Sequence, residues 1–582
     1  MNDGIREPLG RVAAPPDQES TTGEFHFWID RSKTVERTQI VKTQSTIGAR
    51  TVTFIAVVQE VYRRSRQKDV SEEADRYDGG RGSQPPFDSE GVTYAKASVL
   101  RTDPVAYTPP TEECEVYLAS AQEASQGYGV DRVENPLDVG LLKNGGTEYA
   151  GKATLDLDYL LGENGGHMNV NGIAGLGAKS SFLLHVLWML LREAEKQKVA
   201  KPSDRDRLQI APIVFNVKNY DLFFIDQWNK KYREKETEHR DDWTRLGVDG
   251  PAPFRGVKFL APQEKDRTTP ANVGRADGAV KPYSWSLADV VEQGLFKFLF
   301  ADDAVYEPNF GGLVDELSEW LTHDTPAGPK LHTGAEYPKH FEDLLHDFKE
   351  LPPIDNNDYA KATRGKVFRH LKFILRQGSG VLRLNDIKGS PIALANAEQS
   401  GPTVIDLFSL RMTPGLQRFV VAAVFHQLVR LRSENPTPGL RFVVMLDELN
   451  RFAPRNSSDP ITQIIETVAA EMRSQGVILL GAQQQASLVA QRVIANCAIK
   501  AIGRSDTLEL GSDVWKALDR SARSTAAQLQ ADEKLLVQPN FREPMLAKIP
   551  FPPFALKKEH AAGASGPPTP KASWEQSVEA DF

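Results

Sequence analysis

The chain has 582 residues, of which 25% are charged and 40% hydrophobic, so it is long enough and apolar enough for several folded domains. Two cysteines in the whole chain exclude a disulfide-stapled scaffold and suit a reducing compartment. The formal net charge of −8 excludes a broadly basic surface for nucleic acid, although cations gathered in a pore remain compatible with it.

Membrane and secretion signals are not visible in the sequence. The longest apolar run, residues 182–191, is too short to span a bilayer. The first residues contain no apolar segment of the kind that a signal peptide needs. We therefore expect a cytoplasmic protein that does not enter a membrane.

The first part of the chain predicts a small all-β domain. Residues 1–22 are polar and are expected to be a disordered tail. We predict a barrel domain over residues 23–160, interrupted by a charged loop at 63–91. Its strands are short runs rich in β-branched and aromatic residues, at 25–29, 51–58, 94–100, 116–118 and 139–142.

Residues 166–184 read as a strand, a glycine-rich loop and a helix. The glycines let the loop backbone approach an anion at the start of the helix. This pattern is typical of a loop that binds nucleotide phosphates, with Lys179 on the β- and γ-phosphates and Ser180 on Mg²⁺. The predicted contacts are Gly172, Gly175, Leu176, Gly177, Ala178, Lys179, Ser180 and Ser181.

The loop departs from the usual pattern at Ala178, where glycine normally precedes the lysine. On this stretch alone, a glycine turn that enters an apolar core helix, with Lys179 in solvent, is an equal alternative. The departure also leaves the speed of nucleotide hydrolysis open.

Strands alternate with helices in the rest of the chain. Residues 210–217 and 403–407 predict core strands, and 417–432 predict an amphipathic helix that packs on the sheet. This alternation implies a parallel sheet that is covered on both faces. Residues 227–400, which contain a helical stretch at 360–377, are interpreted as a helical insertion.

Residues 440–448 form a buried-strand run that ends in two carboxylates. Asp447 is predicted to hold Mg²⁺, mostly through its waters, and Glu448 to polarise the attacking water. An acidic helix cap after a strand is the alternative for this motif alone. Both motifs in one chain, in this order and with strands between them, predict an ATPase that uses ATP and Mg²⁺.

Two further strands supply polar side chains for the same site. Strand 477–482 leads to Gln483 and Gln484, which are placed to sense the γ-phosphate between the two motif strands. Strand 498–502 leads to Arg504, predicted to enter a neighbouring subunit's site as a finger, and Arg473 is a second candidate. A polar loop start and surface salt bridges are the alternatives. Residues 557–582 are expected to be disordered.

Taken together, these motifs resemble those of the HerA-type ATPases, in the FtsK/HerA branch of RecA-like motors. The resemblance covers about residues 24–556 and implies an α/β RecA-like P-loop ATPase core over 161–556, behind a small HAS-type β-barrel. The stretches that carry it are 166–181, 215–222, 447–454 and 480–487, with Ala495, Asn496, Gly503 and Arg504.

The resemblance implies a homohexameric ring that grips double-stranded DNA in its pore and carries an effector. Effectors of the family are a NurA-type nuclease in end resection, or a nuclease or sirtuin-like NADase in antiviral defence. Two functions therefore stay open: an ATP-driven DNA translocase or helicase-type motor, and a scaffold ring that assembles an effector with little translocation. A conjugation or secretion ATPase is disfavoured because no membrane anchor is visible.

Overall fold

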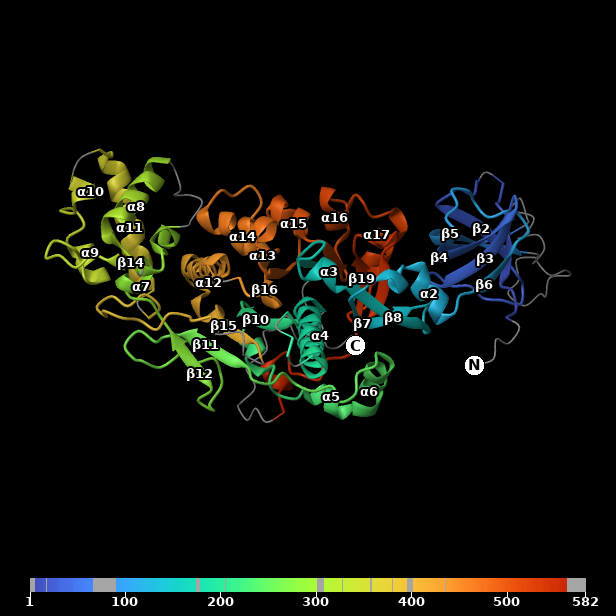
Figure 1. Ribbon diagram of the computed structural model, residues 1–582, viewed down its shortest axis with the longest axis horizontal. Coiled ribbons are helices and arrows are strands. Elements are labelled where there is room, and N and C mark those ends of the chain that lie inside the picture. Colours follow the sequence, from blue (N-terminus) through green and yellow to red (C-terminus); the bar gives the residue numbers. More distant parts are fainter. Residues whose placement is uncertain are drawn as a thin grey trace, which may run out of the picture.

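The structure, a computed structural model, consists of three parts in a row. Figure 1 shows a β-barrel at one end, a large sheet flanked by helices in the middle and a group of helices at the other end. The structure describes residues 6–16, 18–65, 91–173, 178–201, 203–204, 206–300, 308–326, 328–355, 358–378, 380–394, 401–434 and 436–562.

The barrel is a closed antiparallel sheet, with the order β1-β2-β5-β4-β3-β6 over the described residues. Closure removes the exposed edges that a small sheet would otherwise present. Phe25, Phe27 and Phe54 are fully buried inside it. The strands are β1 (Gly10–Val12), β2 (Glu24–Ile29), β3 (Ile40–Ile47), β4 (Arg50–Ser65), β5 (Gly91–Asp103) and β6 (Glu115–Leu118).

The limits of the barrel differ from the predicted range of 23–160. Gly10–Val12, expected in the tail, pairs with both β2 and β6 and so closes the barrel. β7 (Pro136–Lys143) and β8 (Tyr149–Asp156), expected in the barrel, pair with each other, and β7 pairs with β20 (Met545–Lys548) of the large sheet. An alternating apolar pattern marks a strand but not the sheet that it joins.

The central sheet has the order β12-β11-β15-β10-β16-β17-β9-β18-β19-β20-β7-β8 over the described residues. All neighbouring pairs from β12 to β18 are parallel, and all pairs from β18 to β8 are antiparallel. The remaining strands are β9 (Met168–Asn171), β10 (Gln209–Asn216), β11 (Lys258–Pro262), β12 (Val280–Tyr283), β15 (Thr403–Asp406), β16 (Leu440–Asp447), β17 (Val477–Gln483), β18 (Ile499–Ile502) and β19 (Glu533–Val537).

Helices cover both faces of the parallel part, as the alternation in the sequence predicts. Successive residues of β10 point to opposite faces. Val214 belongs to the core cluster that contains α4 (Ala178–Ala200), whereas Phe215 belongs to the cluster that contains α12 (Pro414–Glu434) and α14 (Pro460–Glu471). The sheet is therefore buried on both sides, which explains the nearly continuous apolar runs of its strands.

Short helices connect these elements. They are α2 (Ala121–Gly127), α3 (Leu157–Leu160), α5 (Lys230–Glu234), α6 (Glu236–Arg245), α13 (Leu449–Phe452), α15 (Gln491–Asn496), α16 (Thr507–Leu510) and α17 (Arg520–Gln528). Among the described residues, no helix combines the length and the apolar character that crossing a bilayer requires. Most of the predicted tail at 557–582 and of the predicted loop at 63–91 lies outside the described residues.

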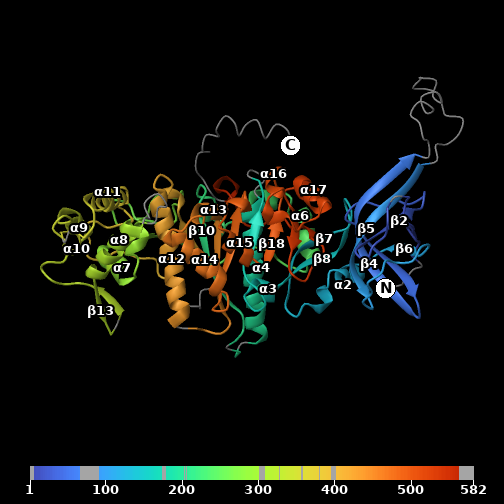
Figure 2. The ribbon, with the colours of Figure 1, turned by 90° about the horizontal axis from the view of Figure 1, so that it is seen from above.

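The segment interpreted as a helical insertion is partly sheet. It contributes β11 and β12, the outermost parallel strands, before the chain enters the helical part. Figure 2 shows this helical part at the end of the molecule far from the barrel. It comprises α7 (Leu287–Glu292), α8 (Pro308–Leu321), α9 (Phe341–His346), α10 (Pro352–Asp355), α11 (Lys361–Gln377) and the hairpin β13 (Thr322–Thr325) and β14 (Gly328–Leu331).

Candidate nucleotide-binding site

The two sequence motifs meet at the carboxyl ends of the central parallel strands. β17 stands between β9 and β16, the two motif strands, which is the order expected for a RecA-like core. Parallel strands bring their carboxyl ends to one sheet edge. Residues 174–177 lie outside the described residues, so the predicted contacts of Gly175, Leu176 and Gly177 are not described, nor is the side chain of Ala178. Ser180 and Ser181 stand in the first turn of α4.

Lys179 is turned inward rather than into solvent. Its Nζ donates hydrogen bonds to the carbonyl oxygens of Gly172, at 2.7 Å, and Ile173, at 3.1 Å, and the residue is only 6% exposed. Burial lowers the pKa of Lys179, and the nearby cation of Lys218 acts in the same direction. The solvent-exposed alternative for Lys179 is thus wrong, and a buried ammonium held by neutral carbonyls is suited to receive a phosphate.

Ser180 and Asp447 present two oxygens that fit a magnesium ion. Ser180 Oγ donates a hydrogen bond to Asp447 Oδ2 at 2.7 Å, and Asp447 is buried. Two oxygens bound to one Mg²⁺ in neighbouring octahedral positions lie about 2.9 Å apart. The pair therefore needs almost no rearrangement to share a Mg²⁺, with phosphate and water oxygens completing the shell.

Lys218 is a further member of this site, and the sequence analysis did not mark it as functional. Its Nζ forms an ion pair with Glu448 and lies 3.6 Å from Asp447 Oδ2. Burial opposes the charged form of Lys218, but the carboxylates of Asp447 and Glu448 outweigh it and raise its pKa. β10 pairs in parallel with β16, so the residues that leave the two strands lie side by side. The position just beyond strand 210–217 was the signal that could have found it.

Glu448 is held in a constrained position. Its backbone has φ 56°, in the left-handed region that costs a non-glycine residue about 1–2 kcal/mol. Its N–H donates to Asp447 Oδ1 at 2.9 Å, and its side chain is 12% exposed beside Lys218. The carboxylate is therefore at the edge of the site with Oε1 engaged by a cation, and its second oxygen can still accept a hydrogen bond from a water.

Gln483 lies at the predicted place, but its amide is already paired. Gln483 Nε2 donates to Asn169 Oδ1, and Asn169 Nδ2 donates to Gln483 Oε1, each at 3.0 Å, and both residues are fully buried. The pair ties β17 to β9 below the phosphate loop. Gln484, the next residue, is exposed and stands beyond the strand end, so it is the one of the two that faces outward.

The two candidate finger arginines lie at opposite edges of the sheet. Arg504 follows β18, is exposed, and accepts a hydrogen bond at its carbonyl from the N–H of Ile173 at 2.8 Å, beside the phosphate loop. Arg473 lies between α14 and β17 and packs against Gly166, which precedes β9. A helix that leads into a parallel strand ends at the strand's amino edge, so Arg473 is on the far side of the sheet from Lys179.

The fold is that of a RecA-like P-loop ATPase, with a β-barrel before it and a helical insertion within it. The strand order, the buried Lys179 at the start of α4 and the carboxylates after β16 define it. No known family model matches the chain, and no curated protein is similar to it in sequence.

Several solved structures are similar to this RecA-like chain. VirB4 of Thermoanaerobacter pseudethanolicus has 14% identity and a TM-score of 0.43, covering 72% of this chain and 98% of that chain. The bacterial conjugative coupling protein TrwB has 12% identity and a TM-score of 0.44, covering 77% and 95%. The genome packaging NTPase of Sulfolobus turreted icosahedral virus 2 has 12% identity and a TM-score of 0.20, covering 26% and 68%. Identities this low transfer no function.

Proposed function

We propose that the protein is an ATPase of the HerA type, which hydrolyses ATP to move DNA through a homohexameric ring. The observation that carries the proposal is the arrangement at one sheet edge. There the buried Lys179 lies at the start of α4, and Ser180 Oγ is 2.7 Å from Asp447 Oδ2. Glu448 is the next residue after Asp447 in the chain. The motifs beyond the site, which resemble those of HerA-type ATPases, support the choice of this branch.

Binding of ATP would begin at Lys179. Its ammonium exchanges the carbonyl oxygens of Gly172 and Ile173 for phosphate oxygens, a charge-assisted interaction that is stronger than the pair it replaces. Ser180 and Asp447 would hold Mg²⁺, which neutralises phosphate charge when it is bound. The positive end of the helix dipole at the start of α4 adds to this attraction.

Hydrolysis then uses the Glu448 carboxylate, of which only Oε1 is paired with Lys218. A water oxygen attacks the γ-phosphorus while the bond from that phosphorus to the β–γ bridging oxygen breaks. The Glu448 carboxylate accepts the hydrogen bond of the attacking water and takes its proton. Lys218 adds a cation next to Asp447 that can offset charge on the transferring group. Gln484 and a neighbouring subunit's Arg504 are the proposed remaining contacts.

The first experiment measures ATP binding and turnover in two variants. Lys179→Ala is expected to lose ATP binding, because the phosphate charge is left uncompensated. Glu448→Gln is expected to bind ATP and to hydrolyse it about 10²–10⁴-fold more slowly. Glu195→Gln, an exposed carboxylate on α4, is the matched control and should behave as the wild type. Wild-type turnover in Glu448→Gln would refute the catalytic assignment.

The DNA part of the proposal is tested by adding double-stranded DNA to the wild-type ATPase assay. Stimulation of turnover, with binding that weakens steeply as salt rises, is expected for a pore that contacts phosphates. ATP hydrolysis that DNA does not change would instead favour the scaffold ring that assembles an effector.

The barrel is the proposed docking site for an effector such as a nuclease or NADase. It contacts the core through hydrogen bonds, including Arg37 to Thr525 and Gln59 to Asp519, and through Ile40, Ile55 and Leu100, which belong to a core cluster of the central sheet. A deletion that tests this idea must stop before Pro136, because β7 and β8 belong to the central sheet. A folded protein that lacks residues 1–118 and still retains its effector in a pull-down would exclude docking through the barrel.

A further inference from the structure

Helix α11 carries charges of one sign only, and it lies outside the nucleotide site. Residues 361–377 contain six Lys or Arg and no Asp or Glu, in a chain whose net charge is −8. The helix buries one apolar face against the insertion, through Val367, Leu371, Ile374 and Leu375. Arg369, Phe373 and Arg376 follow one another at intervals of four and three residues, so they share the opposite, exposed face.

Three cations of this helix, Arg369, Lys372 and Arg376, are not neutralised within the part of the chain that the structure describes. No ion pair is recorded there for any of the three. Phe373, between the two arginines, is 60% exposed. A helix that only needs solubility normally mixes charges of both signs on its outer face. Unpaired cations around an exposed aromatic ring instead indicate a polyanionic ligand.

A hairpin at residues 263–270, closed by its own hydrogen bonds, presents one further cation, Lys265, since Arg267 is paired with Glu264 at 3.7 Å. Gln263 pairs with Pro270, the N–H of Glu264 donates to the carbonyl of Thr269 at 2.9 Å, and Gln263 Nε2 donates to the carbonyl of Arg267 at 2.9 Å. These bonds close the turn on itself. Lys265, at its tip, is exposed.

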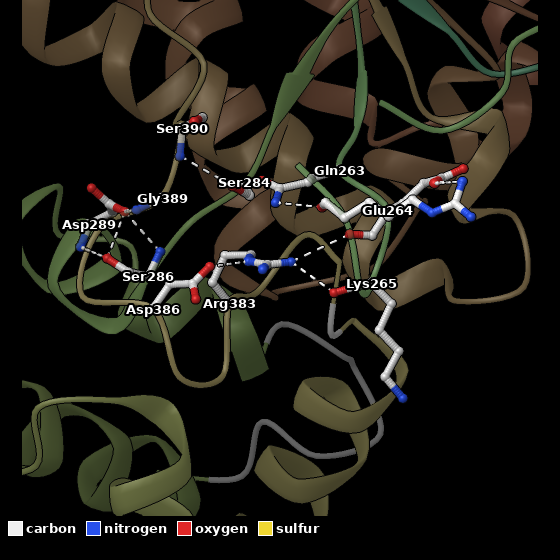
Figure 3. A network of polar contacts seen from close by, with 11 residues as sticks. Gln263, Glu264, Lys265, Ser284, Ser286, Asp289, Arg383, Asp386, Gly389 and Ser390 are labelled. Carbon is white, nitrogen blue, oxygen red and sulfur yellow. Dashed lines mark hydrogen bonds and ion pairs between the residues drawn. The ribbon is translucent and has the colours of Figure 1, made fainter. Parts of the chain in front are cut away.

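Arg383 fixes this hairpin to the rest of the insertion. Figure 3 shows its guanidinium between the carboxylate of Asp386 and the carbonyl oxygens of Glu264 and Lys265, while the side chain of Lys265 extends away from the network. The Nη1–O distance to Lys265 is 3.0 Å. The hairpin backbone is thus held by a charged side chain, which leaves the Lys265 ammonium free to bind a ligand at small entropic cost.

The hairpin and the basic helix border one open hollow. Lys265 and Arg376 both line it, with Gln377, Ser409 and Leu410, and its volume is about 500 Å³. The hairpin begins at the carboxyl end of β11, and Ser409 follows the carboxyl end of β15. The hollow therefore opens at the same edge of the parallel sheet as the nucleotide site.

We propose that the tip of hairpin 263–270 and the exposed face of α11 form a binding surface for the sugar-phosphate backbone of DNA. The inference rests on the proposed function, which it deepens by naming where DNA makes contact. Lys265, Arg369 and Arg376 bind phosphates, and Phe373 stacks on a base where the strand is unpaired. A lipid surface is a poorer fit, because a membrane-bound helix presents a broad apolar face and Phe373 is a single exposed ring.

The experiment compares the full-length wild type with Lys265→Glu/Arg376→Glu by fluorescence anisotropy on a labelled duplex and on one of its strands. We expect the double variant to bind the duplex about tenfold or more weakly, with a log–log salt slope smaller by about 1.8, since each phosphate contact contributes about 0.9. Lys198→Glu/Lys201→Glu, on exposed lysines at the end of α4, is the matched control and should bind as the wild type.

The variants also separate this surface from the nucleotide site and from folding. ATP hydrolysis without DNA should be unchanged in Lys265→Glu/Arg376→Glu, which also shows that the variant is folded. Lys265→Gln/Arg376→Gln should give a smaller loss in the same direction. Phe373→Ala should weaken binding of the single strand roughly fivefold or more and leave the duplex unaffected. An equal effect on both substrates would remove base stacking from the proposal.

Three outcomes would overturn the inference in different ways. Wild-type DNA affinity in Lys265→Glu/Arg376→Glu, with a wild type that does bind DNA, refutes this surface and leaves the proposed function intact. A wild type that binds no DNA refutes the proposed function and this inference with it. Binding of phosphatidylserine vesicles that the double variant abolishes, with DNA binding retained, would assign the surface to a membrane.

Discussion

Replacing Gln483 by Leu is expected to lower the free energy of local opening of β9 and β17, at the nucleotide-binding edge of the sheet, by about 2–6 kcal/mol. Gln483 and Asn169 exchange two hydrogen bonds of 3.0 Å in a fully buried setting. Leu fills a similar volume, so the cavity term is small, but it leaves one donor and one acceptor of Asn169 without partners. Each buried polar group left unpaired costs about 1–3 kcal/mol, which gives the range.

Hydrogen exchange of amides in β9 and β17 is the suitable assay, because a chain of several domains has no single unfolding free energy. A loss of 2 kcal/mol corresponds to about thirtyfold faster exchange at these strands. Gln484→Leu, at the exposed neighbouring position, should leave exchange unchanged. Asn169→Leu/Gln483→Leu should recover part of the protection, because no polar group is then stranded.

The opposite result would support the role predicted for Gln483 from the sequence, as a sensor of the γ-phosphate. If Gln483→Leu keeps wild-type protection in β9 and β17 but loses ATP hydrolysis, the side chain faces the nucleotide rather than Asn169. The amide pair of Gln483 and Asn169 would then contribute nothing measurable to the stability of β9 and β17.

Three further predictions concern charged side chains at the same edge. Lys218→Met should lower the melting midpoint of the nucleotide-free protein, because it removes an ion pair worth about 1 kcal/mol at a lysine that is 44% exposed, and Mg²⁺ with ADP should remove the difference; an unchanged midpoint without nucleotide would contradict the ion pair with Glu448. Burial lowers the pKa of Lys534 to about 8, so its charged form costs stability below pH 8, and this cost is lost as pH rises towards 10.5. Lys534→Met removes a cost of up to about 3 kcal/mol and should therefore raise the melting midpoint at pH 7, with a gain that fades by pH 10.5; a pH-independent gain would contradict this. Arg504→Ala should keep ATP binding and lose turnover, and mixing it with Lys179→Ala should restore some activity if Arg504 acts in trans; mixed rings without recovery would exclude that role.

Much of the candidate site could be predicted from the sequence because its signals are local. Lys179 and Ser180 follow a glycine loop within one continuous stretch, and Asp447 and Glu448 follow one strand. Dense apolar runs that alternate with helices indicate a parallel sheet, and a parallel sheet brings the ends of its strands to one edge. Local sequence patterns of ten or twenty residues were therefore enough to predict that two motifs far apart in the chain lie at the same site.

The partners of individual side chains were decided only by the tertiary structure. Three contacts join residues from separate elements. They are the ion pair of Lys218 with Glu448, the amide pair of Gln483 with Asn169 and the packing of Arg473 against Gly166 at the far edge. The tertiary structure also decides which sheet contains residues 136–156. Their alternating pattern is compatible with the barrel and with the central sheet, and the pairing of β7 with β20 places them in the central sheet. Periodicity fixes which residues face inward, but the choice among buried partners depends on long-range packing, which no local pattern in the chain encodes.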